Sequence, residues 1–462
     1  MNVCGGQCRC GEPIGAQAGE TLRAGRDGGI ASGVNDTAPV APALQDPADE
    51  ARRKKTMGVV FLTLFLDLLG FGVILPVQPF YAESFGASAT MVTLIGASYS
   101  LMQFICAPLW GRLSDRVGRR PVILVSIAFA CVGWLILGFA HALWMFVASR
   151  LIAGFGNANL GTVQAVVADV TAPKDRAKGM GMVGAAFGLG FLFGPIIGGV
   201  FGSRYGAHVP ALIAAGLAAL NWFAAFFLLP ESHPAEKRTV AVAADGHGPR
   251  RSIFPLQALK EALAMPSVAP LLLMGLVFGV GFSLMEAALS LFVERQFVLP
   301  PLGTEAGHKE AAYLSMLVLV TVGVAAVIVQ GGLIRPLRAR FGERSLLLAG
   351  AILVAVGFAG TAALPFLSLP FAAMLALNVV VAAGSGVFSP SSSSLLSRSV
   401  PDDRQGAILG VGQSVASLAR IIGPSMAGAL LELHRSIPFA LGAVLLLVAA
   451  VLTRTVRDPE HV

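Results

Sequence analysis

The sequence predicts an all-α membrane protein whose twelve transmembrane helices form two pseudo-symmetric halves of six. Three observations lead to this prediction: the composition, the number of long apolar stretches and an internal repeat. Hydrophobic residues make up 55% of the 462 residues and charged residues only 13%, with a mean hydropathy of +0.75. A soluble domain carries roughly 25% charged residues, so this chain lacks the charge of a water-facing surface. The composition excludes a disordered protein, a collagen and an ordinary cytosolic enzyme.

The apolar stretches begin at Met57, and each is long enough to cross a hydrocarbon core about 30 Å thick with about 20 residues. Only helices satisfy their own backbone hydrogen bonds at this apolar density. The predicted spans lie near residues 57–80, 91–110, 122–140, 143–167, 179–201, 208–230, 268–293, 311–334, 345–364, 371–396, 406–431 and 437–453.

Polar segments divide the chain between these spans. The longest interior one holds a short amphipathic piece at 253–264 and separates six spans from six. The N-terminal segment has no apolar core of a signal peptide and predicts a disordered tail. The predicted parts are a cytoplasmic tail (1–56), a first six-helix half (57–230), a cytoplasmic linker (231–266), a second six-helix half (267–455) and a C-terminal tail (456–462).

The net charge of +7 is explained by membrane topology. The loops on the side of both tails hold most of the 33 Lys and Arg residues, and the opposite side holds only Arg204, Arg295, Lys309 and Arg435. This asymmetry follows the positive-inside rule. It predicts a multi-pass protein of the cell (inner) membrane, surrounded by lipid, with both termini cytoplasmic. The positive net charge is then explained without a nucleic-acid partner.

The five cysteines imply no disulfide framework, because their number is odd and two of them lie in apolar runs. Cys4, Cys8 and Cys10 cluster in the Gly-rich tail, but no histidine nearby completes a metal site. No metal site is predicted there, and the role of this tail stays open.

An internal repeat relates the two halves. Three short patterns recur 228 to 230 residues later. They are Pro173-x-Asp175-Arg176 with Pro401-x-Asp403-Arg404, Gly154-x-Gly156 with Gly384-x-Gly386, and Gly194-Pro195 with Gly423-Pro424. Parallel repeats of this kind occur in transporters that bind substrate between the halves.

The segment after the second span runs from Gly111 to Pro121 and is expected to form a tight loop. It reads G-R-L-S-D-R-V-G-R-R-P. The positive-inside rule explains its arginines but not the spacing of its glycines and aspartate. The segment resembles the signature G-x-L-x-D-R-x-G-R-R of the major facilitator superfamily. The equivalent segment, Arg335 to Arg344 with Gly342, keeps basic residues but has no aspartate.

That resemblance implies a gating loop. In the family, the aspartate and the arginine after it pair with the other half and hold one conformation closed. The resemblance carries this role to Asp115 and Arg116, within a loop of Gly111, Asp115, Arg116, Gly118, Arg119 and Arg120.

The fifth span is rich in glycine and contains Pro195. Small residues allow a neighbouring helix to come close, and a proline removes one backbone hydrogen bond. Tight packing alone explains the glycines. The complete pattern resembles the antiporter motif of drug/proton exchangers, and its residues are Gly181, Gly190, Gly194, Pro195, Gly198 and Gly199.

Four ionisable residues lie inside predicted spans, where charge is costly and by default functional. Asp67 and Glu286 give one acid in each half, and each is a candidate for proton coupling or substrate binding. A hydrogen bond to a neighbouring helix is the structural alternative for Asp67. Arg150 lies in R-x-x-x-G-x-G, which resembles the fourth-helix motif linked to proton movement. A guanidinium keeps its proton, so Arg150 would act by tuning a neighbour. Arg420 is open to the same two interpretations, functional or structural.

Uncharged polar residues inside spans either line a cavity or bridge helices. These candidates are Asn159, Gln164, Asn378 and Gln413.

The resemblance extends over residues 57–455 and is strongest from Asp67 to Gly199, where the chain is similar to the tetracycline-exporter branch of twelve-helix drug/proton antiporters. It departs from that branch at Cys131 to Trp134, where the third span has no acid, and this puts tetracycline itself in doubt. The resemblance implies proton-coupled efflux of small amphipathic molecules or drugs by alternating access. It also implies a functional monomer that has no cofactor and uses the proton gradient.

Three alternatives stay open. A proton-coupled metabolite symporter or a metabolite exporter would use the same fold. An ion channel is disfavoured by the repeat and by the lack of a filter-like motif. A membrane-embedded enzyme would need clustered catalytic residues, whereas His141 and His208 stand singly at span ends. The chain is therefore not expected to be an enzyme.

Overall fold

The computed structural model describes residues 47–171, 176–232, 256–299, 303–401 and 405–456. The chain divides into a unit of Met1–Pro47 and a unit of Ala48–Val462, and the fold below is that of the second. The cysteine cluster of the tail, most of the linker, residues 457–462 and the two Pro-x-Asp patterns lie wholly or largely outside the described residues.

The described first half is helical. Its elements are α1 (Pro47–Ile74), α2 (Gln78–Glu83), α3 (Ala89–Val117), α4 (Arg119–Gly138), α5 (Leu143–Gly156), the 3₁₀-helix η1 (Asn157–Asn159), α6 (Leu160–Val170), α7 (Arg176–Tyr205) and α8 (His208–Leu228). Pro76 and Pro79 follow and interrupt the first span, and α2 is the short helix that results.

The described second half is helical as well. Its elements are α10 (Leu256–Ala264), α11 (Ala269–Phe297), α12 (Glu305–Ile328), the π-helix η3 (Val329–Leu333), α13 (Ile334–Phe341), α14 (Glu343–Leu367), α15 (Phe371–Arg398), α16 (Gln405–Leu433), α17 (Ile437–Leu452) and the 3₁₀-helix η4 (Thr453–Thr455). Helix α10 coincides with the predicted amphipathic piece.

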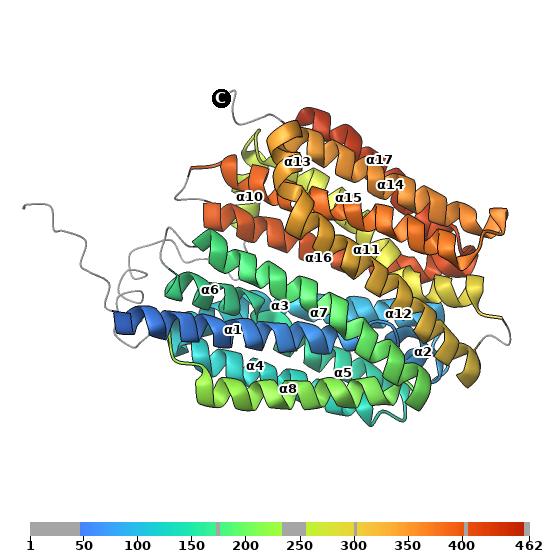
Figure 1. The fold of residues 1–462 in the computed structure, drawn as a ribbon, viewed down its shortest axis with the longest axis horizontal. Coiled ribbons are helices and arrows are strands. Elements are labelled where there is room, and N and C mark those ends of the chain that lie inside the picture. Colours follow the sequence, from blue (N-terminus) through green and yellow to red (C-terminus); the bar gives the residue numbers. More distant parts are fainter. Residues whose placement is uncertain (1–46, 172–175, 233–255, 300–302, 402–404, 457–462) are drawn as a thin grey trace, which may run out of the picture. The chain divides into compact units, whose positions relative to one another are not determined.

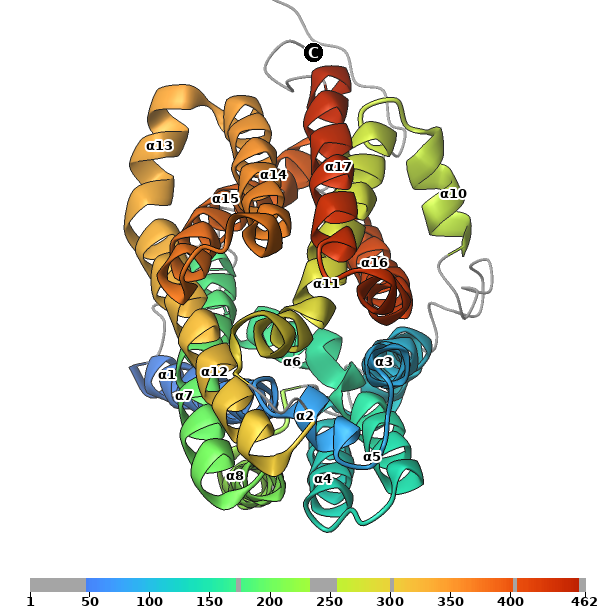
Figure 2. The ribbon, with the colours of Figure 1, turned by 90° about the vertical axis from the view of Figure 1, so that its right-hand side faces the viewer.

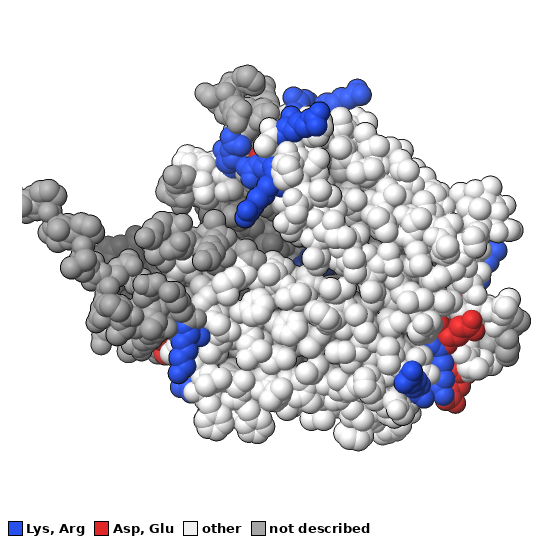
Figure 3. Space-filling view, viewed as in Figure 1, with Lys and Arg blue, Asp and Glu red and all other residues white. Residues whose placement is uncertain are grey.

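Eleven helices of the described residues are long and apolar enough to cross a membrane. Figure 3 shows Lys, Arg, Asp and Glu gathered toward the ends of the helices, with a broad, largely uncharged face between them. This distribution fits a multi-pass membrane protein, because charged side chains are costly inside the hydrocarbon core.

The predicted fourth span, 143–167, accounts for the difference between twelve and eleven. The expectation of one continuous helix was wrong, because α5 ends at Gly156 and η1 separates it from α6. Glycine and asparagine are poor helix formers, and both are concentrated at this break. Together α5, η1 and α6 supply the remaining crossing segment.

Side chains of α3 compensate for the break. The Trp110 indole donates to the Phe155 carbonyl oxygen (2.6 Å), and the Gln103 amide donates to the Asn157 carbonyl oxygen (3.1 Å). Backbone groups that lose their helical partners inside a membrane need such replacements. The break is therefore a stabilised feature of this helix.

The two halves repeat the same packing. Helix α4 packs against α5 and α8 in the first half, and α14 packs against α15 and α17 in the second. Between the halves, α3 runs along α16 and α7 runs along α12, as the end-on view in Figure 2 shows. The interface between the halves is thus built from two helix pairs related by the repeat.

Candidate functional site

Asp67 lies on α1 and is hydrogen-bonded to α8. The Asn221 amide donates from Nδ2 to Asp67 Oδ1 (3.0 Å) and also to the Thr63 carbonyl oxygen (3.0 Å). Asp67 is half-buried and Asn221 is buried. The structural alternative for Asp67, a hydrogen bond to a neighbouring helix, is therefore present.

The glycines of α7 determine how closely this helix approaches α1. A Cβ added at Gly190 would lie 2.7 Å from the Leu68 Cβ. One added at Gly194 would lie 2.6 Å from the Gly72 backbone. Both distances are too short for a side chain, so glycine at these positions lets α7 pack against the part of α1 that carries Asp67.

The remaining residues of the antiporter-type pattern lie on the same helix. A Cβ at Gly198 would overlap the α1 backbone, and one at Gly199 would overlap Met316 of α12 in the other half. The helix continues through Pro195. The surroundings of Gly181 lie outside the described part of the chain. Packing explains these glycines, and the direction of transport that the resemblance implies stays a prediction.

Arg150 on α5 is buried, with 1% exposure. Its Nη1 donates to Gln78 Oε1 (3.3 Å), its Nε donates to Ser149 Oγ (3.4 Å), and its guanidinium lies 4.6 Å from the centre of the Trp134 ring. Nη2 is buried without a hydrogen-bond partner. These contacts are with uncharged groups, so the positive charge of Arg150 is available to a neighbouring anion.

Tyr99 on α3 connects the charged groups of both halves, and sequence reasoning did not select it. Asp67, Arg150 and, across the interface, Arg420 of α16 lie near enough to influence its ionisation, and the neutral hydroxyl meets these charges as a dipole. Its hydroxyl accepts a hydrogen bond from Gln103 Nε2 (3.2 Å). A tyrosine beside a glutamine on an otherwise apolar span was the available signal, because a tyrosine hydroxyl needs a polar partner when it is buried.

We use the name central group for Asp67, Tyr99, Arg150, Glu286 and Arg420. Glu286 and Arg420 are its members from the second half. Glu286 on α11 and Arg420 on α16 are both solvent-accessible and interact electrostatically with each other. Arg420 also interacts with Tyr99 and donates from Nη2 to Ser417 Oγ (3.1 Å). Arg420 is thus near groups on both α3 of the first half and α11 of the second half.

The uncharged candidates divide into two classes. Asn159 and Asn378 are buried and bonded within the protein, the first to Ser126 of α4 and the second to the Met374 carbonyl oxygen of its own helix (2.9 Å). Gln164 is half-buried and Gln413 is exposed. A role in lining a cavity stays a prediction for the last two, and Asn159 bridges helices.

The predicted gating loop is almost entirely helical. Helix α3 continues to Val117, and α4 begins at Arg119, so Gly118 alone joins them. Gly118 has a φ of 115°, a region that favours glycine. The expected loop from Gly111 to Pro121 was therefore wrong in its backbone, and Gly111 lies inside α3 rather than at a turn.

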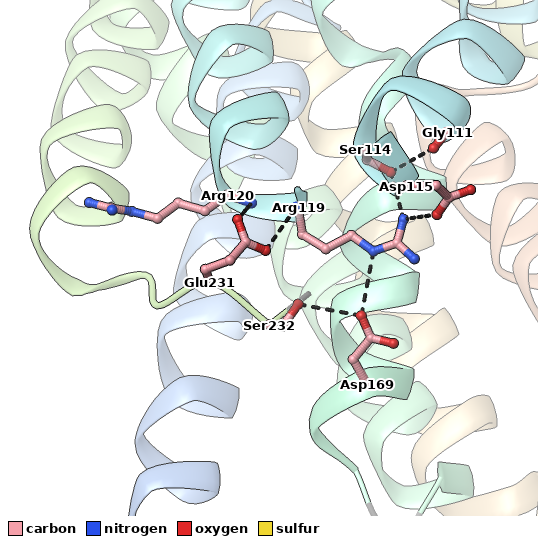
Figure 4. A network of polar contacts seen from close by, with 8 residues as sticks. All are labelled: Gly111, Ser114, Asp115, Arg119, Arg120, Asp169, Glu231 and Ser232. Atoms are coloured by element: carbon pink, nitrogen blue, oxygen red, sulfur yellow. Dashed lines mark hydrogen bonds and ion pairs between the residues drawn. The ribbon is translucent and has the colours of Figure 1, made fainter. Parts of the chain in front are cut away.

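Figure 4 shows the polar network around this junction, which lies entirely within the first half. Arg119 Nη1 pairs with Asp115 Oδ1 (2.5 Å) and donates to Ser114 Oγ (2.6 Å). Arg119 Nε lies 3.4 Å from Asp169 Oδ2 on α6. Arg116 is exposed. Asp115 thus contacts its own half in this conformation, and its pairing with the other half stays a prediction.

Glu231, which follows α8, accepts hydrogen bonds at the start of α4. Its Oε1 receives the backbone N–H of Arg119 (2.9 Å), and its Oε2 receives that of Arg120 (3.3 Å). A carboxylate at a helix N-terminus is stabilised by the helix dipole. The Arg120 side chain turns away to the Phe226 carbonyl oxygen (2.6 Å). Sequence reasoning placed Glu231 in the linker and missed these two contacts, which join residues 112 and 111 positions apart.

The second half has an equivalent junction at Gly342, with a φ of 74° between α13 and α14. The carboxylate that the sequence lacks before the glycine is supplied after it by Glu343. Glu343 pairs with Arg338, lies 3.5 Å from Arg398 Nη1 and accepts from Ser394 Oγ (2.6 Å). The prediction of a basic loop without an aspartate is correct in sequence, but Glu343 provides the negative charge.

The halves are held together at the opposite end of the helices from Gly118. Thr90, at the start of α3, donates from its backbone N–H and its hydroxyl to the Glu432 carboxylate of α16 (3.0 and 2.8 Å). The Gly428 N–H donates to Thr93 Oγ1 (3.1 Å). We refer to this end as the Glu83 end, after the last residue of α2. An arrangement closed there and carrying central charged groups can bind a solute between the halves.

Comparison with known proteins agrees with this geometry. The family described as Major Facilitator Superfamily matches residues 60–339 and 297–462. Tetracycline resistance protein, class C, of Escherichia coli is 32% identical over 397 residues, covering 84% of this chain and 94% of that protein. Multidrug resistance protein 2 of Bacillus subtilis is 28% identical over 415 residues, covering 88% and 97%.

Solved structures lead to the same family. The crystal structure of the human organic anion transporter MFSD10 (TETRAN) has a TM-score of 0.64 and 25% identity, covering 88% of this chain and all of that one. The nucleoside transporter NupG shares the fold, with a TM-score of 0.66 and 14% identity over 87% of this chain and 98% of that one. The chain therefore belongs to the Major Facilitator Superfamily and is a multi-pass membrane transporter rather than an enzyme.

Proposed function

We propose that the protein exports small amphipathic molecules or drugs in exchange for protons, by alternating access between its two halves. The proton gradient is the energy source, no cofactor takes part, and the monomer in the lipid bilayer of the cell (inner) membrane is the working unit, with both termini cytoplasmic. Similarity to proteins named for tetracycline and multidrug resistance supports export.

The single observation that carries the coupling is the position of Glu286. Glu286 is exposed and interacts electrostatically with Arg420, which also lies near Tyr99 of the first half. When Glu286 is charged, it neutralises Arg420. When it takes up a proton, Arg420 loses that partner. Proton transfer at Glu286 therefore changes the charge of the central space, as exchange of a proton for a solute requires.

Asp67 has the second role in this proposal. The Asn221 amide fixes one of its carboxylate oxygens, Oδ1. A fixed carboxylate attracts the cationic part of an amphipathic solute. Arg150, buried behind Tyr99 and Gln78, acts by tuning these neighbours rather than by losing its own proton.

A second candidate, transport of organic anions or other metabolites on the same fold, is favoured by the two arginines. Arg150 Nη2 is buried without a partner, and Arg420 is exposed. Similarity to the human MFSD10 protein, described as an organic anion transporter, points the same way. The direction of flux under an imposed pH gradient separates exchange from symport.

The test uses purified protein in detergent and in proteoliposomes, with tetracycline, other cationic drugs and organic anions as solutes. Wild-type protein is expected to release protons when a transported solute is added. Glu286→Gln should bind the solute but release no protons and support no proton-driven flux. Asp67→Asn should weaken binding, most strongly for cationic solutes.

Glu310→Gln is the matched control, because Glu310 is exposed near the start of α12 and distant from the central group. It should behave like the wild type in all three measurements. Proton release by Glu286→Gln at the wild-type level would remove Glu286 from the coupling. Solute accumulation in the direction of proton flow would show that the protein is a symporter and not an exchanger.

A further inference from the structure

Three side chains of the kinds that bind metal ions, two carboxylates and one imidazole, meet at the Glu83 end, outside the central group. Glu83 lies on α2, Glu294 near the end of α11 and His308 near the start of α12. Their nearest carboxylate and imidazole atoms all lie within 4.8 Å of one another. Figure 2 shows α2 beside the start of α12 at this end. The first half contributes one of these side chains and the second half contributes two.

Two facing atoms of this cluster are buried without a hydrogen-bond partner. The Glu294 side chain is 4% exposed, and its Oε1 has no partner. His308 Nε2 is also buried and unpartnered, and the two atoms face each other at 3.6 Å. Unsatisfied buried polar atoms are costly, so a ligand bound by both of these atoms would be favourable.

The distances from His308 to the two carboxylates are longer than hydrogen bonds and fit a shared metal ion. His308 Nε2 lies 3.6 Å from Glu294 Oε1 and 3.8 Å from Glu83 Oε2. Hydrogen bonds from imidazole to carboxylate are about 2.7–2.9 Å long. Ligand atoms about 2.0–2.1 Å from a tetrahedral zinc ion lie about 3.4 Å apart. Small side-chain rotations would therefore complete such a site.

Charge leads to the same conclusion. Glu83 and Glu294 bring two carboxyl groups together in a largely enclosed place, with side-chain exposures of 15% and 4%. Arg295 follows Glu294 in the chain, but its Nη1 donates to the Leu431 carbonyl oxygen (3.2 Å). A divalent cation would compensate both carboxylates at once.

We propose that Glu83, Glu294 and His308 bind a divalent transition-metal ion of the zinc type, and that this ion holds the two halves together at the Glu83 end. One imidazole and two carboxylates form a set that suits zinc or cobalt, with the fourth position left to water. Because the ligands come from both halves, the ion binds the conformation closed at this end and opposes its opening.

The experiment uses purified full-length protein in detergent, freed of metal with a chelator. Zn²⁺ is added while the thermal unfolding midpoint is followed, and Co²⁺ is added while its visible absorption is recorded. Wild-type protein should gain several degrees in midpoint and give the intense absorption of four-coordinate Co²⁺. Mg²⁺ should do neither, because it prefers six oxygen ligands.

Glu294→Gln and His308→Gln test the ligands. Each should weaken Zn²⁺ binding by at least about tenfold, the loss that removal of even an outer partner of a metal site can cause. Without metal, each should unfold near the wild-type midpoint, because the Gln amide can donate a hydrogen bond to a remaining carboxylate of the cluster. That comparison separates the loss of a ligand from a failure to fold.

His434→Gln is the matched control. His434 is an exposed imidazole that stacks on Phe366 (5.5 Å), and its replacement should leave Zn²⁺ binding unchanged. Equal Zn²⁺ affinity in the wild type and both ligand variants would overturn the proposal. Stabilisation of the metal-free wild type by low pH alone, with no effect of Zn²⁺, would show a shared proton in place of the ion and would also overturn it.

These measurements need no transported solute, so they are independent of the proposed export function. In proteoliposomes with a known solute, Zn²⁺ should slow transport by the wild type but not by Glu294→Gln. A chelator should restore the wild-type rate.

Discussion

In the first half the chain passes from α3 to α4 through Gly118, and in the second it passes from α13 to α14 through Gly342. Both glycines have a positive φ (115° and 74°) and an extended ψ (160° and 163°). The side chains beside them have reversed charges. Arg119 lies between the carboxylates of Asp115 and Asp169, whereas Glu343 lies among arginines.

The reversal changes how each junction is exposed. Asp115 is 58% exposed, but Glu343 is only 5% exposed. A buried acid surrounded by cations of its own half stabilises that half, while an exposed one stays available to a partner that approaches during the transport cycle. The backbone conformation of the junction is therefore the same in both halves, whereas its charged side chains are arranged differently.

The two glycine–proline pairs, Gly194-Pro195 and Gly423-Pro424, are alike in both halves, because each glycine allows close packing of two helices. Gly194 of α7 packs against the α1 backbone, and Gly423 of α16 packs against Ser283 and Leu284 of α11. In each half the fifth helix thus packs tightly against the first. The halves agree where packing is required and differ where charges are arranged.

The largest effect is expected from Gly194→Leu and Gly423→Leu. Each would force a side chain into the backbone of the neighbouring helix, at a cost of about 3 kcal/mol or more. Both variants should lose transport and yield little monodisperse protein in size-exclusion chromatography. Gly184→Leu and Gly410→Leu are the controls, because nothing lies within 4 Å of a Cβ at either position. A well-folded, active Gly423→Leu protein would break the equivalence of the two halves.

Glu343→Gln should have the next largest effect. It removes the charged partner of Arg338 and Arg398, which are themselves 49% and 40% exposed, so that water replaces part of the loss. We expect a destabilisation of about 1–3 kcal/mol, measured as a lower thermal midpoint in detergent. If Glu343→Gln and Asp115→Asn have the same thermal midpoint, the difference in burial between the two junctions does not affect stability.

Gly118→Ala should cost about 1–3 kcal/mol, because a φ of 115° with an extended ψ is essentially restricted to glycine. Gly342→Ala should cost a similar amount. Gly111→Ala is the control, because Gly111 is helical and has nothing within 4 Å of its Cβ. It should be neutral or slightly stabilising. Unchanged thermal midpoints for both junction variants would show that neither backbone conformation is strained.

Much of this fold could be predicted from the sequence, since apolar density fixes where membrane helices lie. The errors occur where tertiary contacts override local pattern. Trp110 and Gln103 stabilise a break in the fourth span that hydropathy treats as continuous. The polar segments after the second and eighth spans are helical up to Gly118 and Gly342, because charged residues form helices readily once they have partners.

The candidate site was less predictable. Asp67, Glu286 and Arg420 could be selected because ionisable residues are rare inside spans. Tyr99 and Glu343 were missed because neither residue type is unusual at its position. Glu83 and His308 lie at span ends, where polar residues are common, and only the fold brings them together from positions 225 apart in the sequence.

The smallest effect on stability is expected from Asp115→Asn. Asp115 is 58% exposed, and its partner Arg119, although only 12% exposed, keeps Asp169 as a second carboxylate neighbour. Ion pairs with an exposed member contribute about 0–1 kcal/mol, so expression and thermal midpoint should stay near wild type. Transport should nevertheless fall, because the proposed pairing of Asp115 with the second half would be lost in the conformation closed at the Gly118 end. Asp115→Glu should restore part of the rate, since it keeps the charge but shifts it by one methylene. Transport rates in proteoliposomes check this, with Glu310→Gln as the control. A normal transport rate for Asp115→Asn would mean that Asp115 does not pair with the second half during gating. The two junctions would then differ only in their contribution to stability.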